Sequence, residues 1–208
     1  MALVLQSIDP SGVATLTLND EANLNAMSDE MAVEFSAAVA SLKASKDLRA
    51  LILTGAAVGA GLCVACACDF RVAADTTKLG FTFLKLGLHP GMGATYFVPR
   101  IVGRSMATEL LVTGRVIAAD EALRIGIVSR VVPAADVIKT ARAIADEILT
   151  CGPEATKQLL QTMRGDSSEL TAALEREAVC QSVNYSGAEF AEGVAAVKEK
   201  RSPRFAKR

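Results

Sequence analysis

The sequence predicts an α/β fold in which strands and helices alternate over residues 1–133 and a helical region follows over residues 134–208. Two patterns carry this prediction. Apolar and polar residues alternate over 13–18, as in a strand with one buried face. An apolar stripe at spacings of three and four runs from Met31 to Leu42, which is typical of an amphipathic helix. With 208 residues, 51% of them hydrophobic and only 4% aromatic, the chain is long enough to bury a core that must be aliphatic.

The first half contains signals for each element in turn. Residues 3–6 and 13–18 are predicted to pair as strands, because Asp9-Pro10-Ser11-Gly12 between them suits a turn in which proline fixes φ and glycine accepts positive φ. Ser28 is predicted to cap a helix that ends near residue 44. The next elements expected are a buried strand over 48–54, a helix of small residues from Gly55 to about Cys68, and strands over 70–73 and 79–83.

Helical signals dominate the second half. Short helices are predicted over 105–113 and 119–124, closed by Gly114 and Gly126. A strand is predicted over 127–132. Four helices are then expected, over 134–150, 153–164, 168–183 and 187–200.

Charge and composition exclude several classes of protein. Lys and Arg total 22 against 23 Asp and Glu, so the net charge of -1 gives no electrostatic case for nucleic acid. Five cysteines, three of them crowded together, do not form a disulfide framework and favour a reducing, cytoplasmic setting. The N-terminal residues lack the basic and long apolar regions of a signal peptide.

Residues 51–68 carry no charge over eighteen positions, which is the minimum length for a membrane-spanning helix. Three glycines within seven residues weaken a continuous helix, and aromatic and strongly basic flanks are absent from this stretch. We therefore expect a buried strand followed by a buried helix, and no membrane insertion.

Common catalytic patterns are mostly absent. The sequence has no P-loop, no complete G-x-G-x-x-G and no G-x-S-x-G, and His89 is its only histidine. Cys63, Cys66 and Cys68 have a C-x-x-C-x-C spacing that can bind metal, but no second cluster completes such a site. We interpret these thiols as core packing and predict no metal.

Glycine-rich turns remain as candidates for chemistry. Gly59-Ala60-Gly61 precedes a predicted helix without charged side chains. The first N–H groups of a helix have no internal partner and can stabilise an oxyanion on a carbonyl substrate. Close backbone packing explains the same glycines equally well, so both readings stay open on this pattern alone.

Longer motifs follow one another along nearly the whole chain. They are AVGAGLC (57–63) with ACDFRVA (67–73), GLHPGMGAT (87–95), LVTG (111–114) with Ala119 and Glu121-Ala122, GIV (126–128), and the ending Glu192-Gly193 with EKRSPRF (199–205). Together they resemble the crotonase (enoyl-CoA hydratase/isomerase) superfamily. The resemblance implies a spiral of ββα turns, a helical C-terminal trimerisation region and acyl-CoA thioester substrates.

The chain departs from the family between Gly55 and Ala56. Members of the family carry several dozen residues there, including their first oxyanion-hole segment and much of their CoA-binding loop. Either this segment is deleted, or the sequence as written leaves out a loop that the protein has. The second reading is favoured, because removing elements from a packed core would uncover apolar faces.

A second departure concerns the catalytic acids. By the resemblance, the two glutamates of the hydratases correspond to Cys63 and Phe83, and the aspartate of the dienoyl isomerases and dehalogenases corresponds to Gly91. None of these three positions carries a carboxylate. The family's second oxyanion N–H corresponds to Ala60, which retains it because it is a backbone group. Gly59, Gly61, His89 and Pro90 are expected to contribute to substrate binding.

We therefore expect an acyl-CoA-processing lyase or isomerase that stabilises a thioester enolate in a backbone oxyanion hole without the usual glutamate pair. A base could come from the missing segment, from Cys63 if the helix N-terminus lowers its pKa, or from His89. The alternatives are a decarboxylase or hydrolase of the same family, or a non-catalytic acyl-CoA-binding protein. No cofactor is expected beyond the coenzyme A of the substrate, and the expected assembly is a homotrimer or hexamer.

Overall fold

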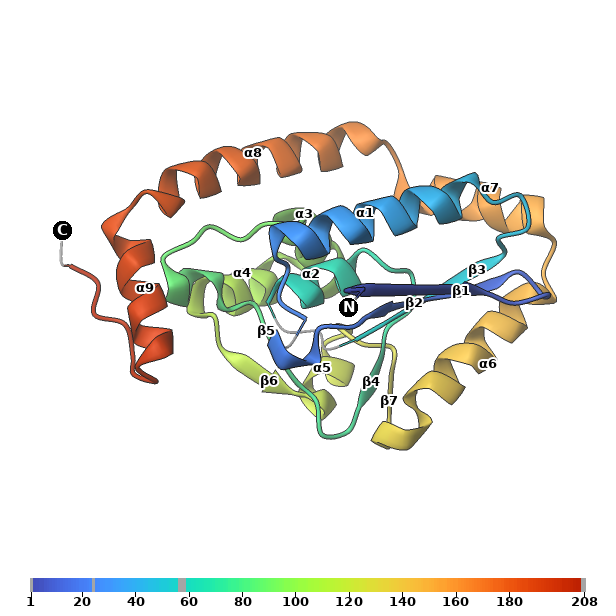
Figure 1. Ribbon diagram of the computed structural model, residues 1–208, viewed down its shortest axis with the longest axis horizontal. Helices are drawn as coiled ribbons and strands as arrows, with labels where there is room; N and C mark the ends of the chain where they lie inside the picture. Colours follow the sequence, from blue (N-terminus) through green and yellow to red (C-terminus); the bar gives the residue numbers. More distant parts are fainter. Residues whose placement is uncertain (1, 24, 56–58, 207–208) are drawn as a thin grey trace.

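A computed structural model describes residues 2–23, 25–55 and 59–206 of the chain. Strands and helices alternate in the first part, and long helices follow (Figure 1). The elements up to residue 86 are β1 (Val4–Ile8), β2 (Val13–Leu18), the 3-10 turn η1 (Glu21–Asn23), α1 (Asp29–Ala44), β3 (Ala50–Thr54), α2 (Ala60–Cys66), β4 (Val72–Ala74), β5 (Lys78–Gly80) and the 3-10 turn η2 (Thr82–Leu86). The later elements are α3 (Ala94–Val102), α4 (Arg104–Thr113), β6 (Val116–Ala118), α5 (Ala119–Arg124), β7 (Arg130–Val132), η3 (Ala134–Asp136), α6 (Val137–Leu149), α7 (Pro153–Arg164), α8 (Ser167–Tyr185) and α9 (Ala188–Lys198).

Helices pack against both faces of the three-stranded sheet β1–β2–β3, while most of β1 stays exposed. β1 and β2 form the predicted antiparallel pair, joined by a turn in which Gly12 has φ +86°, and β3 adds parallel to β2. Ala14 and Leu16 pack with Leu42 of α1 on one face. Val13 and Ile52 pack with residues of α6 on the other face. β2 shows the predicted alternation, since Ala14, Leu16 and Leu18 are buried on one face while Thr15 and Thr17 on the other face are partly exposed.

The N-terminal helix matches its prediction closely. The Ser28 side chain accepts a hydrogen bond from the Met31 N–H and caps α1. Met31 and Leu42 are buried on the predicted stripe, and Phe35 packs beside them. Local capping and periodicity were sufficient here because the sheet receives the same face that the sequence marks as apolar.

Two predicted strands are longer than the strands in the structure, because each pairs with its neighbour over only three residues. β5 pairs with β6 over three residues only, so the predicted strand 79–83 ends at Gly80 and the 3-10 turn η2 takes its place. Likewise β7 pairs with β4 from Arg130 onward, and the first part of the predicted strand 127–132 is buried without pairing. A strand extends only as far as its partner, and the partner is not visible in local sequence.

Three further elements differ from the prediction. The helix α3 was not predicted; Pro99 lies inside it, and a proline within a pattern argues against a helix. The strand β6 was also missed. The helix α2 ends at Cys66 and not near residue 68, because the N–H groups of Ala67 and Cys68 turn to the carbonyls three residues back.

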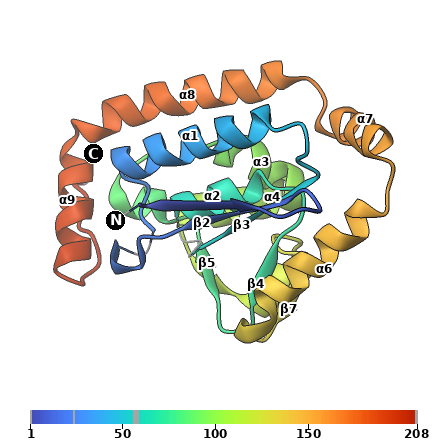
Figure 2. The ribbon, with the colours of Figure 1, turned by 45° about the vertical axis from the view of Figure 1, so that its right-hand side comes forward.

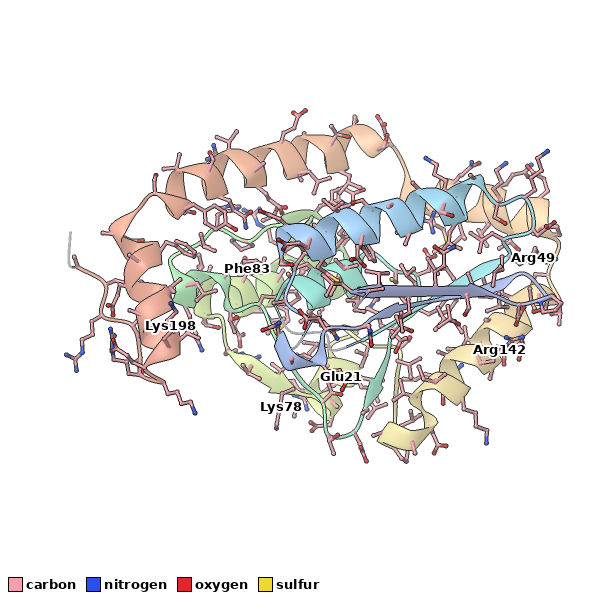
Figure 3. All side chains as sticks on the ribbon, viewed as in Figure 1. Glu21, Arg49, Lys78, Phe83, Arg142 and Lys198 are labelled. Carbon is pink, nitrogen blue, oxygen red and sulfur yellow. The ribbon has the colours of Figure 1, made fainter. Side chains whose placement is uncertain are left out.

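The C-terminal helices α6 to α9 wrap around the outside of the core, from the lower right over the top to the left (Figure 2). At one end, Arg142 of α6 pairs with Asp9 of the β1–β2 turn, and Arg49 donates to the carbonyls of Leu149 and Cys151 at the end of α6. Figure 3 shows Arg49 and Arg142 at the end of the molecule opposite to α9. Among the described residues, no helix combines the length and the apolar character that crossing a membrane requires.

At the other end, α9 packs tightly on η2. A Cβ added at Gly193 would lie 2.5 Å from backbone atoms of Leu86, and one added at Gly87 would lie 2.6 Å from the Glu189 backbone. These two glycines are therefore required by the close approach of the two backbones. Gly87 also adopts φ +66°, where glycine is favoured for its conformation.

Candidate active site

The glycine turn predicted from the sequence lies at the start of α2. Gly59 has φ +57° and ψ −113°, and its N–H donates to the Gly80 carbonyl at 3.2 Å. Ala60 is the first residue of α2, and the N–H groups in the first turn of a helix have no acceptor within the helix. Gly59 offers no capping side chain to that end. The junction between Gly55 and Ala56, where the resemblance implies a missing segment, adjoins residues 56–58, which lie outside the described part of the structure.

Cys63, which the sequence resemblance aligns with the family's first acid, lies one turn into α2. Its side chain is 0% exposed, and its Sγ lies 3.4 Å from the Gly59 carbonyl, to which the thiol donates. Burial raises the pKa of the Cys63 thiol far above its usual range, and the charges of Cys66 and Glu177 raise it further. The hypothesis that the helix N-terminus lowers this pKa is therefore wrong, and Cys63 stays protonated at neutral pH. Burial also raises the pKa of Cys66 to about 11.

Phe83, at the position of the second acid, lies in η2 and not in a strand. Its half-buried ring packs against the core cluster that contains Cys63. In Figure 3 it lies between α9 and the core. The structure thus brings positions 63 and 83 into one apolar cluster, in which neither side chain can exchange a proton with a substrate at neutral pH.

The segment from His89 to Gly91 forms a loop before α3. Pro90 and Gly91 are buried and His89 is half-buried. The Nδ1 of His89 lies 2.7 Å from the Pro90 carbonyl, and because a carbonyl only accepts, Nδ1 carries the proton in the neutral ring. Nε2 is then the ring nitrogen with the free lone pair.

Sequence reasoning missed the residue that organises this loop, Glu177 of α8. Its carboxylate is 2% exposed and accepts three hydrogen bonds: from the Gly93 N–H at 2.7 Å, the Thr95 N–H at 2.8 Å and the Thr95 Oγ1 at 2.6 Å. It caps the N-terminus of α3 from a distant helix, where a negative charge is favourable. In the sequence it stands in Glu175-Arg176-Glu177, which is indistinguishable from a solvated helix face.

One hollow of the surface is poorly suited to an anionic ligand such as acyl-CoA. A hollow of about 350 Å³ at the start of α1 is lined by Asp29, Glu30, Val33 and Glu34, and its three carboxylates oppose an anionic ligand. No group of three or more His, Cys, Asp or Glu side chains within residues 2–23, 25–55 and 59–206 is placed to hold a metal ion.

Comparison with known proteins gives a consistent assignment. The family described as Enoyl-CoA hydratase/isomerase matches residues 54–208. The chain is 34% identical over 208 residues to the "Probable enoyl-CoA hydratase echA8" of Mycobacterium tuberculosis, covering all of this chain and 80% of that protein. It is 37% identical over 154 residues to the "Crotonyl-CoA hydratase" of Syntrophomonas wolfei, covering 74% of this chain and 59% of that protein.

Among solved structures, an enoyl-CoA hydratase/isomerase from Pseudoalteromonas atlantica superimposes with a TM-score of 0.89 at 25% identity, covering 98% of this chain and all of the other. An enoyl-CoA hydratase from Mycobacterium avium subsp. paratuberculosis gives a TM-score of 0.92 at 24% identity, covering all of both chains, which supports the fold. The predicted crotonase fold with a helical C-terminal region is confirmed, and the chain belongs to the enoyl-CoA hydratase/isomerase family.

Proposed function

We propose that this protein binds acyl-CoA thioesters and stabilises the enolate of the thioester through the Ala60 N–H. The observation that supports the proposal is the Gly59 turn, after which the Ala60 N–H stands in the first turn of α2 with no side-chain cap from Gly59. Family membership supplies the substrate class, since named relatives are a crotonyl-CoA hydratase and a short-chain-enoyl-CoA hydratase. The segment that the family carries after position 55 is absent from this sequence, in which Ala56 follows Gly55 directly, so the proposal rests on the Ala60 N–H alone.

The residues at positions 63, 83 and 91 do not suit the hydration of an enoyl-CoA by a pair of glutamates. Adding water to a conjugated thioester requires one group to deprotonate water and one to protonate the α-carbon. Positions 63, 83 and 91 hold Cys, Phe and Gly, and the thiol is held protonated. We therefore propose that hydration by the glutamate-pair mechanism is very weak. A decarboxylation or hydrolysis that needs no such pair is the second candidate, and a non-catalytic acyl-CoA-binding role is the third.

Calorimetry with a non-reactive acyl-CoA analogue tests the binding proposal. We expect saturable heat with the intact chain. Gly59→Ala should weaken binding, because alanine strains the positive φ that aims the Ala60 N–H. Gly165→Ala is a matched control, since Gly165 also has positive φ with open space around its Cα but lies at the end of α7. The absence of detectable heat at millimolar analogue would refute the proposal.

Turnover on a panel of acyl-CoAs separates the three candidates. The double substitution Cys63→Glu with Phe83→Glu should raise crotonyl-CoA hydration above that of the parent if the oxyanion site is intact. Circular dichroism must first establish folding, because Cys63 is fully buried and a carboxylate there is costly. Hydration by the parent at a rate usual for the family would show that a base outside these positions acts.

We also propose a homotrimer, or two trimers paired into a hexamer, in the cytoplasm. Apolar side chains stay exposed on α7 and α8, among them Leu159, Met163 and Leu174. Exposed apolar patches of this kind mark interfaces. All five cysteines are free thiols, as suits a reducing compartment. Light scattering that gives only a monomer over a wide concentration range would refute the assembly.

A further inference from the structure

Helices α7 and α8 form a segment that is anchored at its two ends and packed loosely in between. At one end α6 is tied to the β1–β2 turn and to Arg49, and at the other end α9 packs closely on η2. Between these anchors α7 and α8 run along the outside of the core (Figures 1 and 2). Every residue of α7 is at least partly exposed, and Glu177 is the one buried residue among those described in α8. Burial of apolar side chains therefore contributes little to holding this segment.

The face of α8 that meets the core carries a row of polar side chains. Glu177, Gln181 and Asn184 are spaced four and three residues apart, so they share one face of the helix. Val179 and Val183 each follow a member of this row by two positions, which is about 200° around a helix. They therefore point away from the core, and they are 57% and 66% exposed. These valines do not hold α8 in place, and the hydrogen bonds of the polar row take that role.

All three side chains of the polar row bind the loop 89–95. Asn184 Oδ1 accepts from the His89 N–H at 2.8 Å, and Gln181 Nε2 donates to the His89 carbonyl at 2.9 Å. Glu177 accepts from two further N–H groups at the end of the loop, as described above. Because three N–H groups and one carbonyl of the loop have their partners on α8, the conformation of the loop depends on the docking of α8.

We propose that α7 and α8 form a strap whose docking on the core is coupled to the order of the loop 89–95. When the polar face of α8 leaves the core, the loop loses its hydrogen-bond partners, while the sheet β1–β2–β3, which makes none of these contacts, stays folded. Gly152 and Gly187 mark the ends of the strap, where the backbone can turn while α6 and α9 stay in place. The coupling is reciprocal, so a molecule that binds the docked form of the loop also stabilises the docked strap. The inference rests on these contacts and not on the proposed substrate.

Native-state hydrogen exchange at low urea concentrations tests the coupling in the full chain without a ligand. We expect the amides of α8 and of the loop 89–95 to exchange through one shared opening. That opening should be roughly 10- to 100-fold more populated than the one that exposes the buried amides of β2. If the strap, the loop and the sheet exchange only together, through global unfolding, the inference is overturned.

A substitution in the polar row tests whether its members act together. Gln181→Ala removes a bond to a loop carbonyl, and Gln181 bonds to neither the Gly93 nor the Thr95 N–H. We nevertheless expect exchange of these two N–H groups to rise roughly 3- to 10-fold, as loss of one neutral hydrogen bond shifts the shared opening. Gln158→Ala is the matched control, since this exposed glutamine of α7 binds only Glu154 among the described residues, and it should leave the loop unchanged.

The reverse test places the substitution in the sheet. Ile52→Val thins the packing between β3 and α6 and touches no residue of the strap. We expect faster exchange of the sheet amides and unchanged exchange in α8 and the loop. Equal acceleration of the strap and the sheet by Ile52→Val would overturn the inference, and so would a Gln181→Ala variant that leaves the N–H groups of residues 93 and 95 as in the parent. If Gln181→Ala does not fold, Asn184→Ala carries the same comparison, because Asn184 also bonds to neither of these N–H groups.

Discussion

The buried carboxylate of Glu177 provides a sharp test of how the C-terminal helices support the site. In Glu177→Gln, the new amide group must face either the Gly93 N–H or the two donors of Thr95. When the amide group faces Gly93, the remaining carbonyl oxygen still accepts both hydrogen bonds from Thr95. One bond to a charged acceptor is then lost, and the Gly93 N–H is left without its acceptor. Loss of such a bond costs about 1.5–3 kcal/mol, so we expect a loss of about 2–3 kcal/mol in the free energy of unfolding.

Glu177→Ala removes the acceptor for all three donors and leaves a cavity. We expect a loss of about 3–5 kcal/mol, comparable to removing one member of a buried charged pair. That is a large fraction of the total stability of about 5–15 kcal/mol typical of a folded chain. The conservative variant Glu177→Gln therefore carries the test if the alanine variant does not fold.

The assay is urea unfolding followed by far-UV circular dichroism at neutral pH. Glu175→Gln on the exposed side of the same helix is the matched control and should stay within about 0.5 kcal/mol of the parent. A loss below about 1 kcal/mol for Glu177→Gln, or equal losses at positions 175 and 177, would refute the reasoning that this carboxylate caps α3.

Further expectations concern the thiol, the glycine turn and the C-terminal ion pair. Cys63→Ala should leave the pH profile of any turnover unchanged, because the buried thiol stays protonated; a profile that loses an ionisation would contradict this. In native protein, iodoacetamide should modify the exposed Cys151 well before Cys63, as peptide mass spectrometry can follow. Gly59→Ala should lower the free energy of unfolding by about 1–3 kcal/mol through backbone strain, since a Cβ there would meet no atom of the described residues within 4 Å; urea unfolding measures it. Hydrogen bonds from Arg201 and the Arg204 N–H lower the pKa of Glu192 from 4.5 to about 2, so its contribution is complete above pH 4.5 and is lost as pH falls toward 2. The urea midpoints of the parent and of Glu192→Gln should therefore differ at neutral pH and converge near pH 2, and a constant difference would contradict the ion pair.

The sequence alone was sufficient for features that depend on neighbours along the chain. The β1–β2 turn, the Ser28 cap and stripe of α1, and the glycines that close α4 and α5 were predicted correctly. Each is encoded within a few residues by dihedral preference, capping or periodicity. The order of short motifs also identified the family and, with it, the fold and the helical C-terminal region. The same motifs also supplied the candidate site residues, which stay predictions.

Contacts between distant segments decided the rest. The pKa of Cys63 depends on how completely other elements bury it, so a helix N-terminus that favours the thiolate in isolation is outweighed by desolvation. The strand predicted at Phe83 lost its partner after Gly80 and became a 3-10 turn. Glu177 and Gln181 resemble surface residues in the sequence, and they acquire their roles only because folding brings them to Gly93 and His89, which lie 84 and 92 positions away. Residue type and local spacing determine which groups a chain possesses, whereas the solvent exposure and partners that set their chemistry exist only in the folded structure.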